Sequence, residues 1–305
     1  MTIHIFGEAM LEYHSGGSSG GLRYGGDTLN TAIHLARMGH DVRYVTAVGT
    51  DRISDALVAA WQAEGIDTRY VLRHPSRNPG IYAIYVDGVG ERSFLYWRDH
   101  SAAREMFLLD GMHEAVAAAE AGSLLYFSLI SLAILPLDGR DSLLALAGRC
   151  RASGCRVAYD SNFRANLWPS LVEARRISEQ AVAIADIGLP TNTDESELAG
   201  IVQDELAIVQ RWQLLGCSEV VLKSGERGCL ISNGNEAPIS KAVRPIAMID
   251  SSGAGDAFNG GYLAARLKGK SSEDSTELGH ALAAWVIQRR GTVPAIDDEA
   301  PYSKK

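Results

Sequence analysis

The chain has 305 residues, of which 46% are apolar and 22% are charged, and its formal net charge at pH 7 is −8. This composition is typical of a globular enzyme and excludes an intrinsically disordered chain. Because the sequence has no run of Lys or Arg, the acidic balance argues against a nucleic acid or an anionic membrane as the main partner.

The four cysteines, Cys150, Cys155, Cys217 and Cys229, form no C-x-x-C pair and have no histidine at zinc-ligand spacing. We therefore expect them to be reduced thiols in the core. The residues after Met1 show no basic segment followed by an apolar one, and no stretch reaches the roughly 18 apolar residues that a membrane helix needs. These features predict a cytoplasmic protein.

The first predicted elements alternate between buried strands and amphipathic helices. A polar, Gly-rich loop over 15–26 leads into a helix, because Leu29, Ala32, Ile33 and Ala36 recur at helical spacing. The segments around this helix are predicted as strands over 2–6 and 42–48 and a helix over 54–64. The pattern is that of an α/β protein.

A pair of aromatic-rich segments interrupts this alternation. They lie on either side of Asp87-Gly88 and have the pattern of a β-hairpin joined by a tight turn. We predict a small β lid formed from segments near 8–24 and 80–98, attached to a single domain that spans 1–305.

After the hairpin the alternation resumes. The remaining predicted elements are strands over 124–128, 156–160, 186–189, 219–223, 228–232 and 243–249, and helices over 138–152, 171–185, 195–202, 205–215, 256–267 and 273–290. Repeated strand–helix units predict a mainly parallel sheet covered by helices on both faces. Such sheets bind ligands beyond the carboxyl ends of their strands, so polar residues at those ends are candidate site residues.

The segment Gly253-Ala254-Gly255-Asp256 lies between a predicted strand and a predicted helix. Its small residues let a phosphate approach the backbone N–H groups at the helix N-terminus, where the helix dipole favours an anion. Asp256 then lies where a carboxylate can accept a proton from an attacking hydroxyl. The alternative is an ordinary Gly-rich turn followed by an acidic residue in the first helical turn.

Two more polar segments fall at predicted strand ends or helix entrances. Gly26 lets a hydroxylated ligand lie close to the backbone, and Asp27 and Asn30 can bond to it; a turn with an Asp cap is the alternative. Arg164 follows Asp160 in an extended segment, and Arg is suited to holding a carboxylate in a bidentate pair. A surface salt-bridge cluster is the alternative for this second segment.

These motifs resemble those of the ribokinase-like (PfkB) carbohydrate kinases. Residues 250–258 are similar to the family's C-terminal signature D-T-T-G-A-G-D-x-F, with Ser251 and Ser252 in place of the threonines, and residues 25–30 are similar to its N-terminal G-G-x-x-x-N. The resemblance implies a ribokinase-like α/β fold with a β-sheet lid and an ATP-dependent sugar kinase. It also implies ATP and Mg²⁺ as cofactors, with K⁺ as a further cation near Asp250 and Ser252.

The same resemblance implies roles for individual residues. Asp256 is the catalytic base, assisted by the amides of Gly253, Ala254 and Gly255. Implied ATP-binding residues are Asn192, Lys223, Ser224, Gly225, Gly228, Gly253 and Gly255, and implied substrate-binding residues are Gly26, Asp27, Asn30, Tyr82, Tyr96, Arg98, Arg164 and Asp256. Glu195, in an N-x-x-E pattern, is implied to hold Mg²⁺ through water. From the residues alone, a helix cap and a plain hairpin turn remain alternatives for the segments at 192–195 and 223–228.

Two segments resemble the 2-keto-3-deoxygluconate kinases within the family, namely D-x-N-x-R-x-x-L-W from Asp160 and Tyr-x-Arg at 96–98. They imply phosphorylation of this sugar acid at its 6-hydroxyl, with Arg98 and Arg164 at the sugar. A fructokinase or another sugar kinase would keep the same chemistry, and a non-catalytic sugar-binding regulator is the alternative of another class. Because an aromatic lid leaves a sheet edge exposed, we expect a homo-oligomer formed through the lid.

Overall fold

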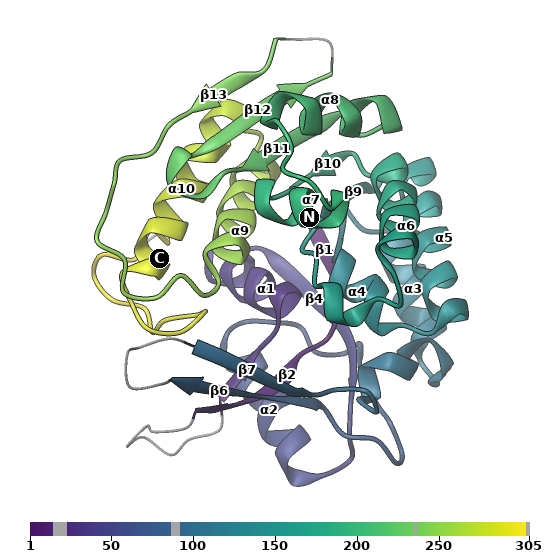
Figure 1. Cartoon of the computed structure of the whole chain (residues 1–305). Coiled ribbons are helices and arrows are strands. Elements are labelled where there is room, and N and C mark those ends of the chain that lie inside the picture. Colours follow the sequence, from purple (N-terminus) through teal and green to yellow (C-terminus); the bar gives the residue numbers. More distant parts are fainter. Residues whose placement is uncertain (15–22, 87–91, 235–236, 303–305) are drawn as a thin grey trace.

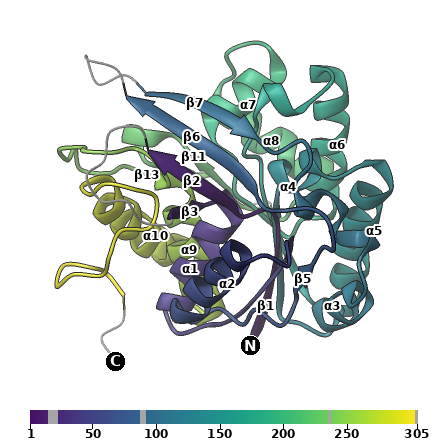
Figure 2. The same cartoon turned by 90° about the horizontal axis from the view of Figure 1, so that it is seen from below.

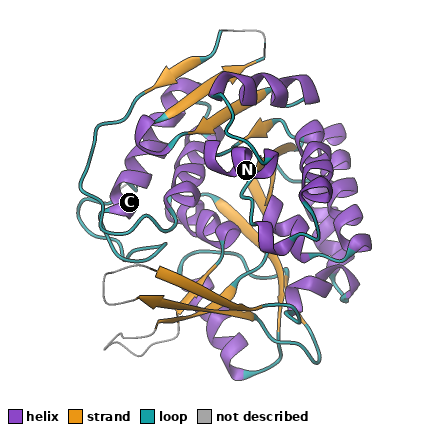
Figure 3. Ribbon diagram, in the orientation of Figure 1, coloured by secondary structure: helices purple, strands orange, loops and turns teal. Residues whose placement is uncertain are grey.

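The computed structural model describes residues 1–14, 23–86, 92–234 and 237–302. A large sheet with helices on both faces forms the body of the molecule, and a small sheet lies against one side of it (Figure 1, and coloured by secondary structure in Figure 3). The predicted turn pair Asp87-Gly88 lies outside the described residues.

In the described part of the chain the large sheet has nine strands in the order β13-β12-β11-β10-β9-β8-β1-β4-β5. Their bounds are β1 Thr2–Phe6, β4 Asp41–Val48, β5 Val71–Arg73, β8 Leu124–Ser128, β9 Arg156–Asp160, β10 Ile187–Gly188, β11 Glu219–Lys223, β12 Cys229–Asn233 and β13 Ile239–Lys241. The strands from β5 to β11 pair in parallel, while β12 pairs antiparallel with both β11 and β13. The predicted, mainly parallel sheet is confirmed.

Helices cover both faces of this sheet, as predicted. One face carries α1 Asp27–Arg37, α2 Arg52–Ala63, α9 Ala254–Leu267 and α10 Ser272–Ile287, and the other carries α3 Met112–Glu120, α4 Leu129–Ile134, α5 Leu137–Ser153, α6 Leu171–Ile184, α7 Asn192–Ala199 and α8 Glu205–Leu215. In the described residues no helix is long and apolar enough to span a bilayer. The four cysteines are buried and free, as expected.

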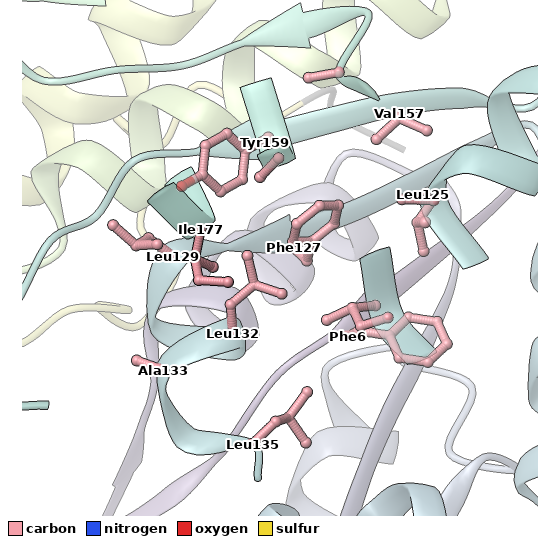
Figure 4. Packing of buried hydrophobic residues seen from close by; sticks show 14 of the residues in the cluster. Phe6, Leu125, Phe127, Leu129, Leu132, Ala133, Leu135, Val157, Tyr159 and Ile177 are labelled. Carbon is pink, nitrogen blue, oxygen red and sulfur yellow. The ribbon is translucent and has the colours of Figure 1, made fainter. Parts of the chain in front are cut away.

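The core is divided between the two faces by the alternation of side chains along each strand. In β8, Leu125 and Phe127 pack with α4 and α6, whereas Leu124 and Tyr126 belong to the cluster under α1 and α9. Figure 4 shows the first of these clusters, where Phe127 lies among residues of neighbouring strands and the helix that follows β8. Strands buried on both faces read as continuous apolar runs, which is why the sequence identified them.

The small sheet has the strand order β3-β2-β6-β7. Its strands are β2 Met10–His14, β3 Arg23–Gly25, β6 Gly80–Val86 and β7 Arg92–Trp97. The β6/β7 pair is the predicted hairpin, and β2 joins it in parallel, so both predicted lid segments contribute. Figure 2, seen from below, shows this sheet beside the helices α1 and α2.

The strand predicted over 243–249 is wrong. This segment runs outside the named strands, and Ile249 donates its N–H to Ile287 at the end of α10 (2.8 Å). Pro245 supplies no N–H for a ladder, and the sheet edge is instead formed by β13, which the sequence did not predict. The segment therefore reaches the glycine turn as an extended connection.

Candidate active site

A cavity of about 470 Å³ lies between the carboxyl ends of the parallel strands and the small sheet. The predicted site residues that line it are Gly26, Asp27, Tyr82, Tyr96, Arg98, Arg164, Lys223, Ser252, Gly253, Ala254, Gly255 and Asp256; those that do not are Asn30, Asn192, Glu195, Ser224, Gly225, Gly228 and Asp250. The chain order reverses between β1 and β8, and open α/β sheets bind ligands at such a point. A larger groove of about 730 Å³ at the opposite ends of β9 to β11 contains none of the predicted site residues.

The glycine turn is shaped to receive an anion. Gly253 caps α9 with φ 75°, and a Cβ at this position would lie 2.8 Å from the Thr292 Cα, so glycine is required. Beyond it, the first N–H groups of α9 have no acceptor within the helix, and the helix dipole favours a negative group in front of them. The Asp250 carboxylate fixes the approach to the turn by accepting the N–H groups of Ser252 (3.0 Å) and Gly291 (2.9 Å).

The Asp256 carboxylate is held in one orientation at the inner end of the cavity. Asn30 Nδ2 donates to Asp256 Oδ2 at 2.8 Å, and Thr292 Oγ1 donates to Asn30 Oδ1 at 3.2 Å. Burial, and then the nearby Asp27 carboxylate, raise the pKa of Asp256 to about 8. A carboxyl group with such a pKa exchanges a proton near neutral pH, as a general base must. Asn30 holds Asp256 through this bond but does not itself line the cavity, so its predicted contact with the sugar stays a prediction.

Asp27 stands at the start of α1, beside a second close approach of the backbone. Gly26 has φ 152°, and a Cβ there would lie 2.4 Å from the Glu8 carbonyl oxygen. Asn162 Nδ2 donates to Asp27 Oδ2 at 3.2 Å, while Asn162 Oδ1 has no partner among the described residues. Burial raises the pKa of Asp27. Asp27 and Asp256 thus offer two carboxyl groups to hydroxyls of a ligand.

The small sheet brings two tyrosines and one arginine to the cavity. Tyr82 and Tyr96 are cross-strand partners in β6 and β7, with ring centroids 6.1 Å apart. The Arg98 guanidinium is buried and pairs with the carboxylate of Glu8, which also lines the cavity. Arg98 therefore reaches the site, as the resemblance implied, but its charge is already matched by an acid that the sequence patterns did not single out.

Arg164 is the cation of this cavity that is most open to a ligand. It follows β9, half of its side chain is exposed, and its Nη1 donates to the Phe163 carbonyl oxygen at 2.6 Å. The Asp194 carboxylate lies 3.5 Å away. Because a guanidinium has five N–H donors, Arg164 keeps donors available for a carboxylate.

The first turn of α7 carries two adjacent acids, Asp194 and the predicted metal residue Glu195, which face different surroundings. Glu195 is buried away from the cavity, where Oε2 accepts hydrogen bonds from Arg211 and from Trp212 Nε1 (3.1 Å for the second). Asp194 lines the cavity instead, and burial raises its pKa to about 6, with Arg164 acting to lower it. Successive side chains of a helix point about 100° apart, so two adjacent acids cannot both face the ligand.

The predicted nucleotide loop begins at Lys223 and turns sharply after it. Ser224 donates its N–H to the Gly228 carbonyl oxygen at 2.8 Å. Gly228 has φ 91°, and a Cβ at this position would lie 1.9 Å from the carbonyl oxygen of Lys241. Lys223 lines the cavity, whereas the turn itself does not. The ammonium of Lys223 donates to Asp160 and Asn259, neither of which was among the predicted site residues. Nucleotide contact by the turn stays a prediction.

Comparison with known proteins agrees with the fold and the motifs. Residues 8–299 match the description of the pfkB family of carbohydrate kinases. The 2-dehydro-3-deoxygluconokinase of Escherichia coli is 39% identical over 300 residues, covering 95% of this chain and 96% of that protein, and the enzyme of the same name from Dickeya dadantii is 39% identical over 303 residues, covering 96% of each. The solved structure of 2-dehydro-3-deoxygluconokinase from Thermotoga maritima has a TM-score of 0.82 at 23% identity, covering 97% of this chain and 96% of that one.

Proposed function

The chain belongs to the pfkB family of carbohydrate kinases, and we propose that it transfers the γ-phosphoryl group of ATP to the 6-hydroxyl of 2-keto-3-deoxygluconate, which is also called 2-dehydro-3-deoxygluconate. The products are 2-keto-3-deoxy-6-phosphogluconate and ADP. One observation carries the proposal. The Asp256 carboxyl group, with its pKa raised to about 8, stands beside a glycine turn at a helix N-terminus and inside a polar cavity.

In the proposed reaction, different groups of the cavity have different roles. The 6-hydroxyl oxygen attacks the γ-phosphorus, the bond from that phosphorus to the β–γ bridging oxygen breaks, and the hydroxyl proton passes to Asp256. The turn at 253–255 and the Lys223 ammonium line the same cavity, so they are available to stabilise the negative charge that develops on the phosphoryl oxygens. Preorganised donors of this kind supply a large share of the rate enhancement in many enzymes.

Mg²⁺ supplies neutralisation of the phosphate charge in this proposal. Among the described residues no three His, Cys, Asp or Glu side chains converge as a metal site. A hydrated Mg²⁺ held by nucleotide phosphates needs only one or two protein carboxylates, and Asp194 fits that part because it lines the cavity. We also propose that K⁺ binds near Asp250 and Ser252, supported by the fixed turn there; equal rates in K⁺ and tetramethylammonium salts would contradict this.

The choice of a sugar acid over a neutral sugar rests on Arg164. A neutral hexose offers this guanidinium no charged partner, whereas the carboxylate of 2-keto-3-deoxygluconate can accept two parallel N–H bonds from it. Arg98 is less suited to that role because Glu8 already neutralises it. The Glu8–Arg98 pair suits an uncharged hydroxyl or carbonyl group of the same substrate.

Initial rates with ATP and Mg²⁺ in a coupled ADP assay test the proposal, with 2-keto-3-deoxygluconate, fructose and ribose as acceptors. We expect kcat/KM for the sugar acid to exceed that for either neutral sugar by at least about tenfold, the lower value of one charge-assisted pair. A preference for fructose would support the fructokinase alternative. Binding of sugar and ATP without turnover would support the regulator.

We further propose that a second copy of the chain covers the outer face of the small sheet. Three large side chains are exposed there, Tyr13 at 62%, Leu95 at 57% and Trp97 at 56%. A sheet with exposed apolar side chains and open edges is a common protein interface. Sedimentation of the protein should show a dimer, and replacement of Leu95 and Trp97 by Lys should give a monomer; a wild-type monomer would contradict this part.

A further inference from the structure

A closed ring of hydrogen bonds lies next to the glycine turn and joins three elements of the fold. Lys223, at the end of β11, donates from Nζ to Asp160 Oδ1 at 3.1 Å and to Asn259 Oδ1 at 2.9 Å. Asn259, in α9, donates from Nδ2 to Asp160 Oδ2 at 2.9 Å and so closes the ring. Each side chain therefore restrains the other two.

Asn259 is the residue of this ring whose presence most needs an explanation. It is fully buried in α9, where its neighbours are small or apolar, and a buried amide without partners is costly. A carboxamide carries both an acceptor and donors, so it can accept from the Lys223 ammonium and donate to the Asp160 carboxylate at once. Its Nδ2 also donates to the Tyr126 hydroxyl at 3.1 Å. An aspartate or a leucine at this position could not make the same set of bonds.

The ring places a cation beside the proposed phosphoryl site. A Cβ built on Gly255 would lie 3.9 Å from the Lys223 Nζ, and both residues line the cavity. An ammonium group has three N–H donors, and Asp160 and Asn259 use two of them; the described residues provide no acceptor for the third. A phosphoryl oxygen bound at the glycine turn would therefore meet the remaining N–H.

We propose that Asn259 and Asp160 are positioning residues for phosphoryl transfer, because they hold the Lys223 ammonium where it stabilises charge on the transferring group. The inference rests on the proposed kinase function. It adds two residues that act through Lys223, namely Asn259, which does not line the cavity, and Asp160, which does. Asn259 also lies one helical turn after Asp256 on α9, so the ring fixes the distance between the ammonium and the base.

A double-mutant cycle shows whether Asn259 acts through Lys223. Asn259→Leu keeps the size of the side chain and removes both ring bonds, so kcat should fall at least about tenfold while KM for the sugar changes less than about threefold. In a protein that already carries Lys223→Gln, adding Asn259→Leu should lower kcat by less than about twofold, because the group being positioned is gone. If the double variant instead loses kcat by the product of the two single-variant factors, the two residues act independently and the proposal is overturned.

The variant Asn259→Asp provides a second test, which does not require Asn259→Leu to fold well. When the introduced carboxyl group is protonated, its O–H can donate to Asp160 as the amide did, so the rate relative to wild type at the same pH should rise as pH falls from 8 to 6. The titratable groups that face this position are Asp160 on β9, Lys223 on β11 and Tyr126 on β8. If the rate of Asn259→Asp relative to wild type does not change with pH, the hydrogen bond from position 259 to Asp160 does not matter for the rate and the proposal is contradicted.

Tyr262→Phe is the matched control on the same helix. The Tyr262 hydroxyl donates to Glu219 Oε1 at 2.6 Å, away from the cavity, so its loss weakens the anchoring of α9 without touching the ring. We expect a lower Tm and an unchanged kcat. If Tyr262→Phe lowers kcat as much as Asn259→Leu does, general anchoring of α9 explains the effect and the proposal fails. The wild-type acceptor preference tests the proposed substrate separately, since the cycle is measured with whichever sugar the wild type phosphorylates.

Discussion

Asp256→Asn should remove activity and raise stability at the same time, and the gain in stability should grow with pH. The amide has the shape of the carboxylate, and its oxygen can still accept the hydrogen bond that Asn30 donates at 2.8 Å. It cannot take the proton of the attacking hydroxyl, so kcat should fall by about 10² or more.

The size of the stability change follows from the pKa of Asp256, which is raised from 3.8 to about 8. Between these values the folded protein keeps a proton that the unfolded chain has released, so the free energy of unfolding falls as pH rises through this window. The loss is complete above about pH 8 and reaches at most about 6 kcal/mol, at about 1.36 kcal/mol per pH unit. The amide does not titrate, so the variant does not lose stability in this way. Its free energy of unfolding should exceed that of the wild type by about 2–5 kcal/mol at pH 8 and by about 1–2 kcal/mol at pH 5.

Urea unfolding of both proteins at pH 5 and pH 8, at constant ionic strength, measures this difference. The other buried acids with raised pKa values are Asp27, Asp194 and Glu195, and all three are present in both proteins. Asp194 and Glu195 largely cancel in the comparison, whereas loss of the Asp256 charge also acts on its neighbour Asp27. Asp110→Asn, at an exposed position, is the control and should change neither turnover nor the pH dependence of stability. A variant with near-normal turnover, or one whose stability relative to wild type is the same at both pH values, would refute the reasoning.

Three further substitutions test the metal, the substrate carboxylate and the glycine turn. Asp194→Asn should raise the Mg²⁺ concentration for half-maximal rate by about tenfold, whereas Glu195→Gln should mainly lower Tm. If only Glu195→Gln changes the Mg²⁺ titration, Glu195 and not Asp194 is the metal residue. Arg164→Ala should lower kcat/KM for the sugar acid by about tenfold to 150-fold, corresponding to about 1.5–3 kcal/mol, and leave activity on fructose much less affected. Arg149→Ala, with a similarly exposed side chain paired elsewhere, should affect neither sugar. Gly253→Ala should lower kcat at least about tenfold, because the residue has φ 75°, and normal turnover would show that the turn is not needed in this conformation.

The fold could be predicted wherever the apolar pattern had a single explanation. The i, i+3, i+4 spacing of Leu29, Ala32 and Ile33 identified α1, and the continuous apolar runs identified the buried parallel strands. The helix α4 was missed because its sequence, Leu129–Ile134, is almost entirely apolar and shows no polar face. The strand β5, Val71–Arg73, is too short to show a period.

The site could be predicted where spacing carries the chemistry, as in the glycine turn and Asp256. It could not be predicted where a side chain's direction decides the role. Asp194 and Glu195 are adjacent acids, and only the path of the chain into α7 shows that the first faces the cavity and the second faces Arg211. Asn259 carried a weak signal, since it is a polar residue three positions after Asp256 on the buried side of α9.

A competition experiment tests the central claim most directly. The wild-type protein is given ATP, Mg²⁺ and equal concentrations of 2-keto-3-deoxygluconate and fructose, and the products are identified by mass and by ³¹P–¹H coupling. We expect the phosphorylated sugar acid to form first and in large excess, with its phosphate on the 6-hydroxyl. Fructose phosphate as the main product, or ADP formation without either sugar phosphate, would contradict it.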